Sequence, residues 1–175
     1  MIGTEGNVLA TERFKGDDTQ YYLYNEDICN FGMDQLVITQ YKKILKILQE
    51  NSNILILKIP IEKVKSKEEK EREELQTKNC LIFKKLEKFF LESRLCRKNG
   101  TIIKREKGKK GYYMTDNWYL YKYNKDVRKV LQEYPNIYAF ADWIDLCFVS
   151  ENKIILQTIA HEGMCFGSAE LFRDI

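Results

Sequence analysis

The sequence predicts one α+β domain, residues 1–175, with a mixed or antiparallel sheet, two amphipathic helices, one long charged connecting helix and a C-terminal buried β-hairpin. Three observations lead to this class. Short runs rich in β-branched and aromatic residues, bounded by turn residues, predict strands along much of the chain. Two segments with apolar residues every three or four positions predict helices that cover a sheet. A chain of 175 residues has the length of one domain and can bury a core without disulfide bonds.

The most apolar segment, 143–167, contains the predicted centre of the sheet. In residues 144–148 and 154–159 large apolar side chains occupy both alternating faces, and polar residues 150–152 separate the two runs. A strand that is apolar on both faces is typical of the middle of a covered sheet, not of a half-exposed edge. We therefore expect a buried hairpin here.

The first predicted elements are two strands, 8–14 and 20–25, joined by a turn at residues 15–18. The second strand is rich in tyrosine, which favours a sheet. Residues 26–32 are expected to form a loop.

An amphipathic helix is predicted from about Asp34, a suitable N-cap, to about Glu50. One stripe of this helix is apolar and should face the core; its members are Val37, Tyr41, Ile44, Leu45 and Leu48. A buried strand should follow at residues 54–59 and end at Pro60.

The connecting helix is predicted over residues 66–96. Ser66 and Glu69 have the spacing of a capping box, and residues 67–78 mix acidic and basic side chains as a solvated helix does. The helix would continue through residues 81–95, where Ile82, Leu86, Phe89 and Phe90 form an apolar stripe.

The second half of the chain begins with a basic hairpin. Its predicted strands are 100–105 and 112–114, with a lysine-rich turn between them, and another aromatic strand is expected at 118–121. A short helix is predicted from about Lys125 to Tyr134, before Pro135.

A faint internal repeat is visible when the two halves are aligned. Residues 22–25 recur as 119–122, and the Lys-x-Leu-Gln-Glu pattern that ends at Glu50 recurs at Glu133. This predicts a duplicated ββαβ unit, residues 5–60 and 99–149, joined by the helix at 66–96. Chance similarity of short apolar words is the alternative.

Composition excludes several classes of protein. Apolar residues make up 44% and aromatic residues 13% of the chain, which is far from the composition of disordered proteins. The uncharged apolar runs are short and the first residues do not resemble a signal peptide, so we expect no membrane association. Five scattered cysteines, an odd number, predict reduced thiols and a cytoplasmic location.

His161, Glu162 and Cys165 are the only place where a base, an acid and a nucleophile type lie together. A thiolate and imidazole pair could activate a nucleophile, which gives a small enzyme centred on His161 as one hypothesis. The alternative is a turn at Glu162 and Gly163 with no chemical role. The cysteines lack metal-ligand spacing and no phosphate-binding loop is present, so we expect no metal and no cofactor.

The segment 97–110 contains seven basic residues and one acidic residue, whereas the net charge of the whole chain is only +3. Six of its basic residues and the two tyrosines after it are candidate binding residues: Arg97, Lys104, Arg105, Lys107, Lys109, Lys110, Tyr112 and Tyr113. They would contact phosphates and stack on bases if the protein binds nucleic acid. The alternative is a solvated hairpin tip.

The leading functional hypothesis is a non-enzymatic protein-binding protein, such as a toxin-neutralising immunity protein or an inhibitor of another protein. Such a function needs a complementary surface and no fixed motif, and eleven tyrosines would suit it. Nucleic-acid binding through residues 97–113 and catalysis at His161 are the alternatives. Association of the chain with a second copy of itself is also open.

Overall fold

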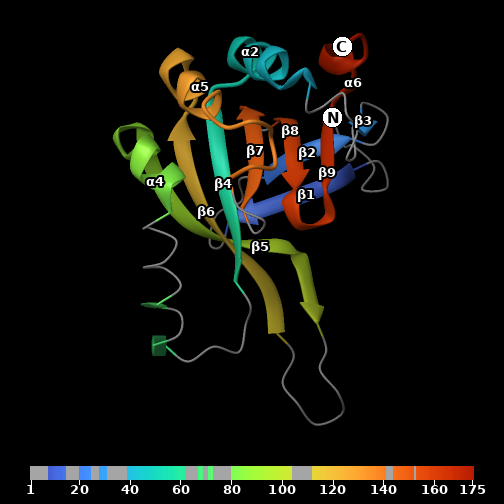
Figure 1. Ribbon diagram of the computed structural model, residues 1–175. Helices are drawn as coiled ribbons and strands as arrows, with labels where there is room; N and C mark the ends of the chain where they lie inside the picture. Colours follow the sequence, from blue (N-terminus) through green and yellow to red (C-terminus); the bar gives the residue numbers. More distant parts are fainter. Residues whose placement is uncertain are drawn as a thin grey trace.

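The computed structural model describes residues 8–14, 20–24, 28–30, 39–61, 67–68, 71–72, 80–103, 112–140, 144–151 and 153–175. Within these ranges the chain is an α+β protein with nine strands in one sheet (Figure 1). The strands are β1 (Val8–Phe14), β2 (Gln20–Tyr24), β3 (Ile28–Asn30), β4 (Ile54–Ile61), β5 (Phe90–Ile103), β6 (Tyr112–Lys122), β7 (Asp145–Ser150), β8 (Lys153–Ile159) and β9 (Met164–Ser168). The helices are α2 (Tyr41–Asn51), α4 (Leu81–Leu86), α5 (Lys125–Leu131) and α6 (Ala169–Phe172), with 3-10 turns η3 (Glu87–Phe89) and η4 (Ala160–Glu162).

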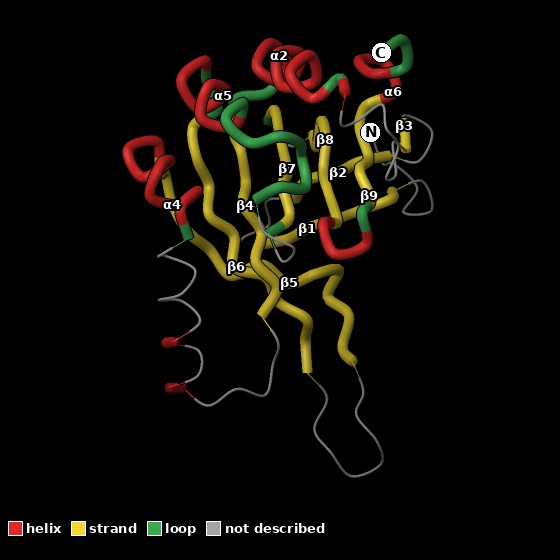
Figure 2. Tube along the Cα trace, viewed as in Figure 1, coloured by secondary structure: helices red, strands yellow, loops and turns green. Residues whose placement is uncertain are grey.

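The strand order of the sheet is β2-β1-β5-β6-β4-β7-β8-β9-β3. Every pair of neighbours in this order is antiparallel. One parallel pair, Tyr22 with Lys153, also joins β2 to β8. The β1–β2 hairpin therefore curls behind the central strands, as Figure 2 shows.

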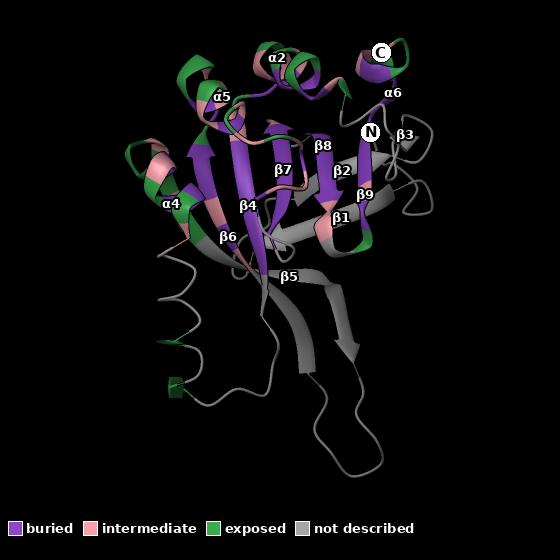
Figure 3. Cartoon of the chain, viewed as in Figure 1, coloured by how far each residue is buried: buried purple, intermediate pink, exposed green. Residues whose placement is uncertain are grey.

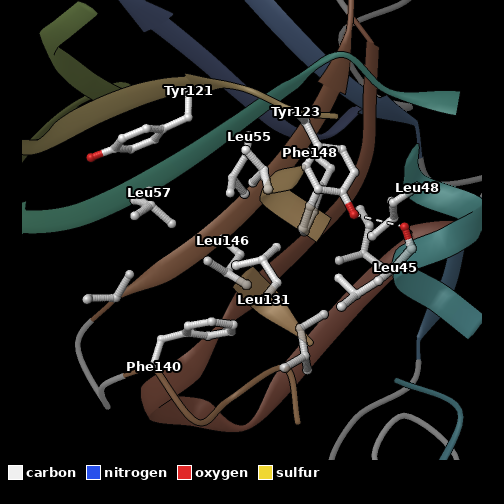
Figure 4. Packing of buried hydrophobic residues seen from close by; sticks show 14 of the residues in the cluster. Leu45, Leu48, Leu55, Leu57, Tyr121, Tyr123, Leu131, Phe140, Leu146 and Phe148 are labelled. Atoms are coloured by element: carbon white, nitrogen blue, oxygen red, sulfur yellow. Dashed lines mark hydrogen bonds between the residues drawn. The ribbon is translucent and has the colours of Figure 1, made fainter. Parts of the chain in front are cut away.

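The larger core lies between the helices and one face of the sheet (Figure 3). Its side chains come from α2, α4, α5 and the inward positions of β4, β6, β7 and β8, and Figure 4 shows a part of it. Two tyrosines tie this core together, because the Tyr123 hydroxyl donates to the Leu45 carbonyl and the Tyr41 hydroxyl to the Leu131 carbonyl, each at 2.8 Å. A smaller cluster, which includes Trp118, covers the other face.

Several predicted elements are confirmed. β1, β2, β4, α2 and α5 are present, and the predicted stripe of α2 is buried at Tyr41, Ile44, Leu45 and Leu48. The hairpin of β7 and β8 lies between β4 and β9, in the middle of the sheet, and is apolar on both faces as expected. Parts of other predictions lie outside the described residues: the turn at 15–18, Asp34 and Val37 of the first helix, Ser66 and Glu69 of the capping box, and the hairpin tip at 104–111.

The prediction of one helix over 66–96 is wrong at its C-terminal end. The α4 helix ends at Leu86, the η3 turn follows, and the chain enters β5 at Phe90. Residues from Phe90 onward pair with β6, starting at Tyr121, so that backbone hydrogen bonds of a long-range sheet replace those of the helix. The apolar run Phe89-Phe90-Leu91 could belong to a helix or to a strand. Pairing with the aromatic strand β6 makes the chain a strand from Phe90 onward.

The boundaries of other elements also differ from the prediction. β4 continues through Pro60 to Ile61, and beyond Lys58 its pairing partner among the described residues is β6. A proline is tolerated in a strand where its missing N–H group is not needed for pairing. The strands predicted at 112–114 and 118–121 are one strand, β6. The predicted loop at 26–32 contains β3, which pairs with β9, and neither β9 nor α6 was expected.

The proposed internal repeat is matched by element order but not by strand pairing. Two strands, a helix and a strand occur as β1, β2, α2, β4 and again as β5, β6, α5, β7, with β3 as an addition to the first set. However, β6 lies between β5 and β4, whereas β2 ends the strand order and pairs with β1 and, at one residue, with β8. Equivalence of residues 22–25 and 119–122, and with it the duplication, is not confirmed.

Candidate protein interaction surface

The strands of the basic hairpin are present, and its candidate residues divide between them. Arg97 is in β5, and Tyr112 and Tyr113 are in β6, where they pair with Ile103 and Ile102. Lys104, Arg105, Lys107, Lys109 and Lys110 lie outside the described residues. The structure thus supports the hairpin itself and leaves its binding role a prediction.

The segment around His161 forms a reverse turn between β8 and β9. His161 and Glu162 belong to η4, Gly163 has a left-handed φ of 62°, and Ile159 pairs with Met164 across the turn. The Glu162 side chain is exposed, whereas Cys165 is fully buried in the larger core. Burial raises the pKa of the Cys165 thiol, which makes it a poor nucleophile. The geometry fits the turn interpretation, because the acid and the thiol are not brought together.

The thiols should differ in reactivity in the native protein. Cys147 and Cys165 are fully buried, whereas Cys80 is partly exposed before α4. We expect a neutral alkylating reagent to modify Cys80 first, and Cys147 and Cys165 only as fast as the fold opens. Mass spectrometry of digested protein over a time course measures each site. Equal alkylation rates at Cys80 and Cys147 would contradict the burial of Cys147 in the core.

The exposed large apolar side chains lie at the start of α4 and at the start of β5. Leu81 is 57% exposed, Phe90 45% and Leu91 53%, and these are the exposed large apolar residues in the described part of the chain. Leu91 lies at a β-bulge, since Phe90 pairs with Tyr121 and Glu92 with Leu120, so that Leu91 is an extra residue in β5. We call Leu81, Phe90 and Leu91 the α4–β5 corner.

The residues around the α4–β5 corner hold it in place. Phe83 of α4 is buried and meets the Tyr119 ring edge-on, with centroids 5.1 Å apart. Phe90 meets the Tyr121 ring in the same way at 5.7 Å. The first contact holds α4 against β6, and the second orders the Phe90 ring before any partner arrives, which lowers the entropy cost of binding through Phe90.

An ion pair links α4 to the end of α5. Lys85 donates to Glu133, and its ammonium lies 5.4 Å from the centroid of the Tyr134 ring. The hydrogen bond to Glu133 raises the pKa of Lys85 above its usual value, so this lysine stays charged at neutral pH. The pair positions α4 beside α5.

The helices on this face of the sheet carry mostly positive charge. Their basic residues are Lys42, Lys43, Lys46, Lys84, Lys85, Lys88, Lys125, Arg128 and Lys129, and their acidic residues are Glu50, Glu87 and Asp126. Lys84, Glu87 and Lys88, which lie between Leu81 and Phe90 in the chain, are exposed. The segment between these apolar residues thus presents two lysines and one glutamate, and β5 continues from it into the basic segment at 97–110.

A second unusual feature is a buried polar group on the other face of the sheet. Lys58 and Asp145 pair across β4 and β7 and are 5% and 9% exposed. The ammonium of Lys58 lies 5.6 Å from the centroid of the Trp118 ring, and an Asp145 carboxylate oxygen accepts the Ala160 N–H at 2.7 Å. These contacts anchor η4 to the sheet, which is a structural role.

The prediction from sequence missed the α4–β5 corner, because it placed Phe90 on the buried stripe of a helix. One signal was present. Three consecutive large apolar residues, 89–91, cannot all face inward from one helix, so at least one had to be exposed or the helix had to end.

Comparisons with known proteins found no matching family model, no matching curated protein and no matching solved structure. In the described ranges no three His, Cys, Asp or Glu side chains gather in a way that could hold a metal ion. Nor does any helix among these residues have the length and apolar character needed to cross a membrane.

Proposed function

We propose that this protein is a non-enzymatic protein-binding protein, of the kind that neutralises a toxin or inhibits another protein, and that it binds through the α4–β5 corner. The exposure of Leu81, Phe90 and Leu91 on a rigid support carries the proposal. Large exposed apolar side chains are candidate anchors for a partner, and aromatic anchors at the centre of an interface supply most of its binding energy.

The partner that fits this surface is a protein with an apolar pocket inside an acidic surround. Lys84 and Lys88 lie between Leu81 and Phe90 in the chain, and the neighbouring α5 adds further basic side chains. Charges at the rim of an interface speed association and select the partner, while the desolvated centre holds the complex. Phe90 would enter the pocket of the partner as the anchor.

Nucleic-acid binding is the second candidate, and one observation favours it. The segment 97–110 contains seven basic residues, and β5 and β6 pair as a hairpin that would present them. Phosphate contacts make binding strongly dependent on salt concentration, with a log–log slope near 0.9 per phosphate neutralised on duplex DNA.

The test begins with capture of partners from the native host, their identification by mass spectrometry, and measurement of Kd with the purified partner. We expect the double variant L81D/F90D to weaken binding by about 30-fold or more, because it places charge in the apolar centre. The matched control K153A/R173A removes the same net charge from exposed positions on β8 and at the C-terminal end of α6, and should bind as the native protein does.

Two outcomes would contradict the proposal. A purified partner that binds L81D/F90D as well as it binds the native protein would place the binding site elsewhere. Retention of DNA or RNA with a steep salt slope, unaffected by L81D/F90D and abolished by K107A/K109A/K110A, would favour the nucleic-acid function instead.

A further inference from the structure

The helices α2 and α5 lie side by side on the same face of the sheet and share its larger core (Figure 1). The Tyr41 hydroxyl at the start of α2 donates to the carbonyl of Leu131 at the end of α5. The Tyr123 hydroxyl, just before α5, donates to the carbonyl of Leu45 within α2. The two helices therefore run antiparallel, and their exposed sides point away from the core (Figure 3).

The exposed basic side chains of these two helices have no acidic partner. They are Lys42, Lys43 and Lys46 of α2 and Lys125 and Lys129 of α5, and we call them the α2–α5 lysine face. None of the five forms an ion pair with another described residue. Together the two helices contain six basic and two acidic residues, so this surface is positively charged.

The positions of these lysines are unfavourable for the helices themselves. Lys42 and Lys46 are four residues apart, as are Lys125 and Lys129, so each pair places like charges on one side of a helix. The first turn of α2 contains two lysines and no acidic residue, although the helix dipole favours negative charge there. These charges do not stabilise the fold, which is the expected property of a surface that binds an anion.

A different part of the chain shows the arrangement that a merely solvated surface has. Lys67 and Glu71 are four residues apart, exposed and joined as an ion pair at 4.0 Å. Opposite charges at this spacing support a helix, and the segment 67–78 mixes acidic and basic residues throughout. The α2–α5 lysine face lacks such pairs, so solvation alone does not account for it.

We propose that the α2–α5 lysine face binds the phosphate backbone of double-stranded nucleic acid without sequence specificity. Lysine ammonium groups bind phosphates as point charges, and contacts to phosphates carry no direct information about the bases. This inference goes beyond the proposed function, because it concerns a different surface and a different ligand and needs no partner protein.

The chemistry of the α2–α5 lysine face fits a duplex better than a protein. The exposed large apolar residues of the described chain are Leu81, Phe90 and Leu91, and none of them is in α2 or α5. The face therefore offers lysines, which are depleted in protein interfaces, and no apolar anchor.

A single strand and a membrane fit this face less well than a duplex. Single strands bind by stacking their bases on aromatic rings, but the only aromatic residue of α2 is the buried Tyr41 and α5 has none. Helices that lie on membranes insert their apolar side, whereas the apolar stripe of α2 is packed in the core. A duplex backbone requires only the positive charges.

The experiment measures binding of a short duplex DNA of arbitrary sequence by fluorescence anisotropy. The purified native chain should bind it with an affinity that falls steeply between about 50 mM and 200 mM salt. Five lysines in contact with phosphates give a log–log slope of about 4 to 5. Exchange of the base sequence should leave the affinity unchanged.

The variant K42E/K125E separates binding from folding. Each new glutamate lies in the first turn of its helix, four residues before Lys46 or Lys129, so the thermal midpoint should equal or exceed that of the native protein. Duplex binding should nevertheless weaken at least about tenfold, and the salt slope should fall by about 2.

The matched control K67E/R72E makes the same change in net charge at exposed positions outside α2 and α5. It should bind the duplex within about threefold of the native protein, because charges away from the contact are screened by salt. Circular dichroism verifies that both variants are folded.

Four results would overturn the proposal. They are absence of duplex binding at about 50 mM salt, an equal loss in K67E/R72E, unchanged binding in K42E/K125E with loss in K107A/K109A/K110A, and displacement of the duplex by poly-glutamate or by phosphatidylserine vesicles at equal charge concentration. The third would place nucleic acid on the basic hairpin, and the fourth would assign the face to an acidic protein or a membrane. None of them concerns capture of a partner by the α4–β5 corner, which L81D/F90D tests separately.

Discussion

Replacing Asp145 with alanine is expected to lower the free energy of unfolding by about 3–5 kcal/mol. Asp145 is 9% exposed and lies opposite Lys58, which is 5% exposed. The substitution removes the carboxylate that lies opposite the buried Lys58 in the sheet, and it deprives the Ala160 N–H of its acceptor, which lies 2.7 Å away. Urea denaturation followed by tryptophan fluorescence measures the change.

A double substitution at positions 58 and 145 separates the effect of the buried charges on stability from the effect of side-chain packing. K58M/D145L replaces both partners with apolar residues of similar size, and buried ion pairs treated in this way often lose little stability. We expect the double variant to be more stable than D145A by at least about 2 kcal/mol. The control E50A removes an exposed carboxylate and should change stability by less than about 0.5 kcal/mol. A loss below about 1 kcal/mol in D145A would show that the buried pair is unimportant.

The sequence allowed the elements with strong local periodicity to be predicted. The stripe of α2 and the double-faced apolar runs of β7 and β8 have the spacings that their structures require, and each is found in its expected place. β5 was missed over residues 90–96, because its state depends on pairing with Tyr121 and the residues before it, which are 31 positions away at Phe90 and 20 positions away at Cys96. No local pattern contains that information.

The sequence analysis missed the candidate surface for the same reason. A place on the apolar stripe of the predicted helix would bury Phe90, whereas in β5 it is 45% exposed. The basic charge of the helices could also be predicted from the sequence, but their positions on the sheet could not.

Alkaline pH should unfold this protein steeply, because its core contains tyrosines that cannot ionise there. Tyr41, Tyr121 and Tyr123 are at most 4% exposed, and burial raises the pKa of each above its ordinary value of about 10. Above pH 10 the unfolded chain therefore loses protons that the folded chain keeps. The folded state binds more protons, so stability falls as pH rises. Three groups together give a slope of about 4 kcal/mol per pH unit.

The variant Y123F tests this slope through a reversal of sign. At neutral pH it should be less stable than the native protein by about 1 kcal/mol, because the hydroxyl no longer donates to the Leu45 carbonyl 2.8 Å away. Above pH 10 it lacks one group that ionises only on unfolding, so its stability falls less steeply, by about 1.4 kcal/mol per pH unit. The stability curves of the two proteins should cross roughly one unit above pH 10. Parallel curves through that range, measured by urea denaturation at each pH, would mean that Tyr123 ionises as readily in the folded as in the unfolded protein.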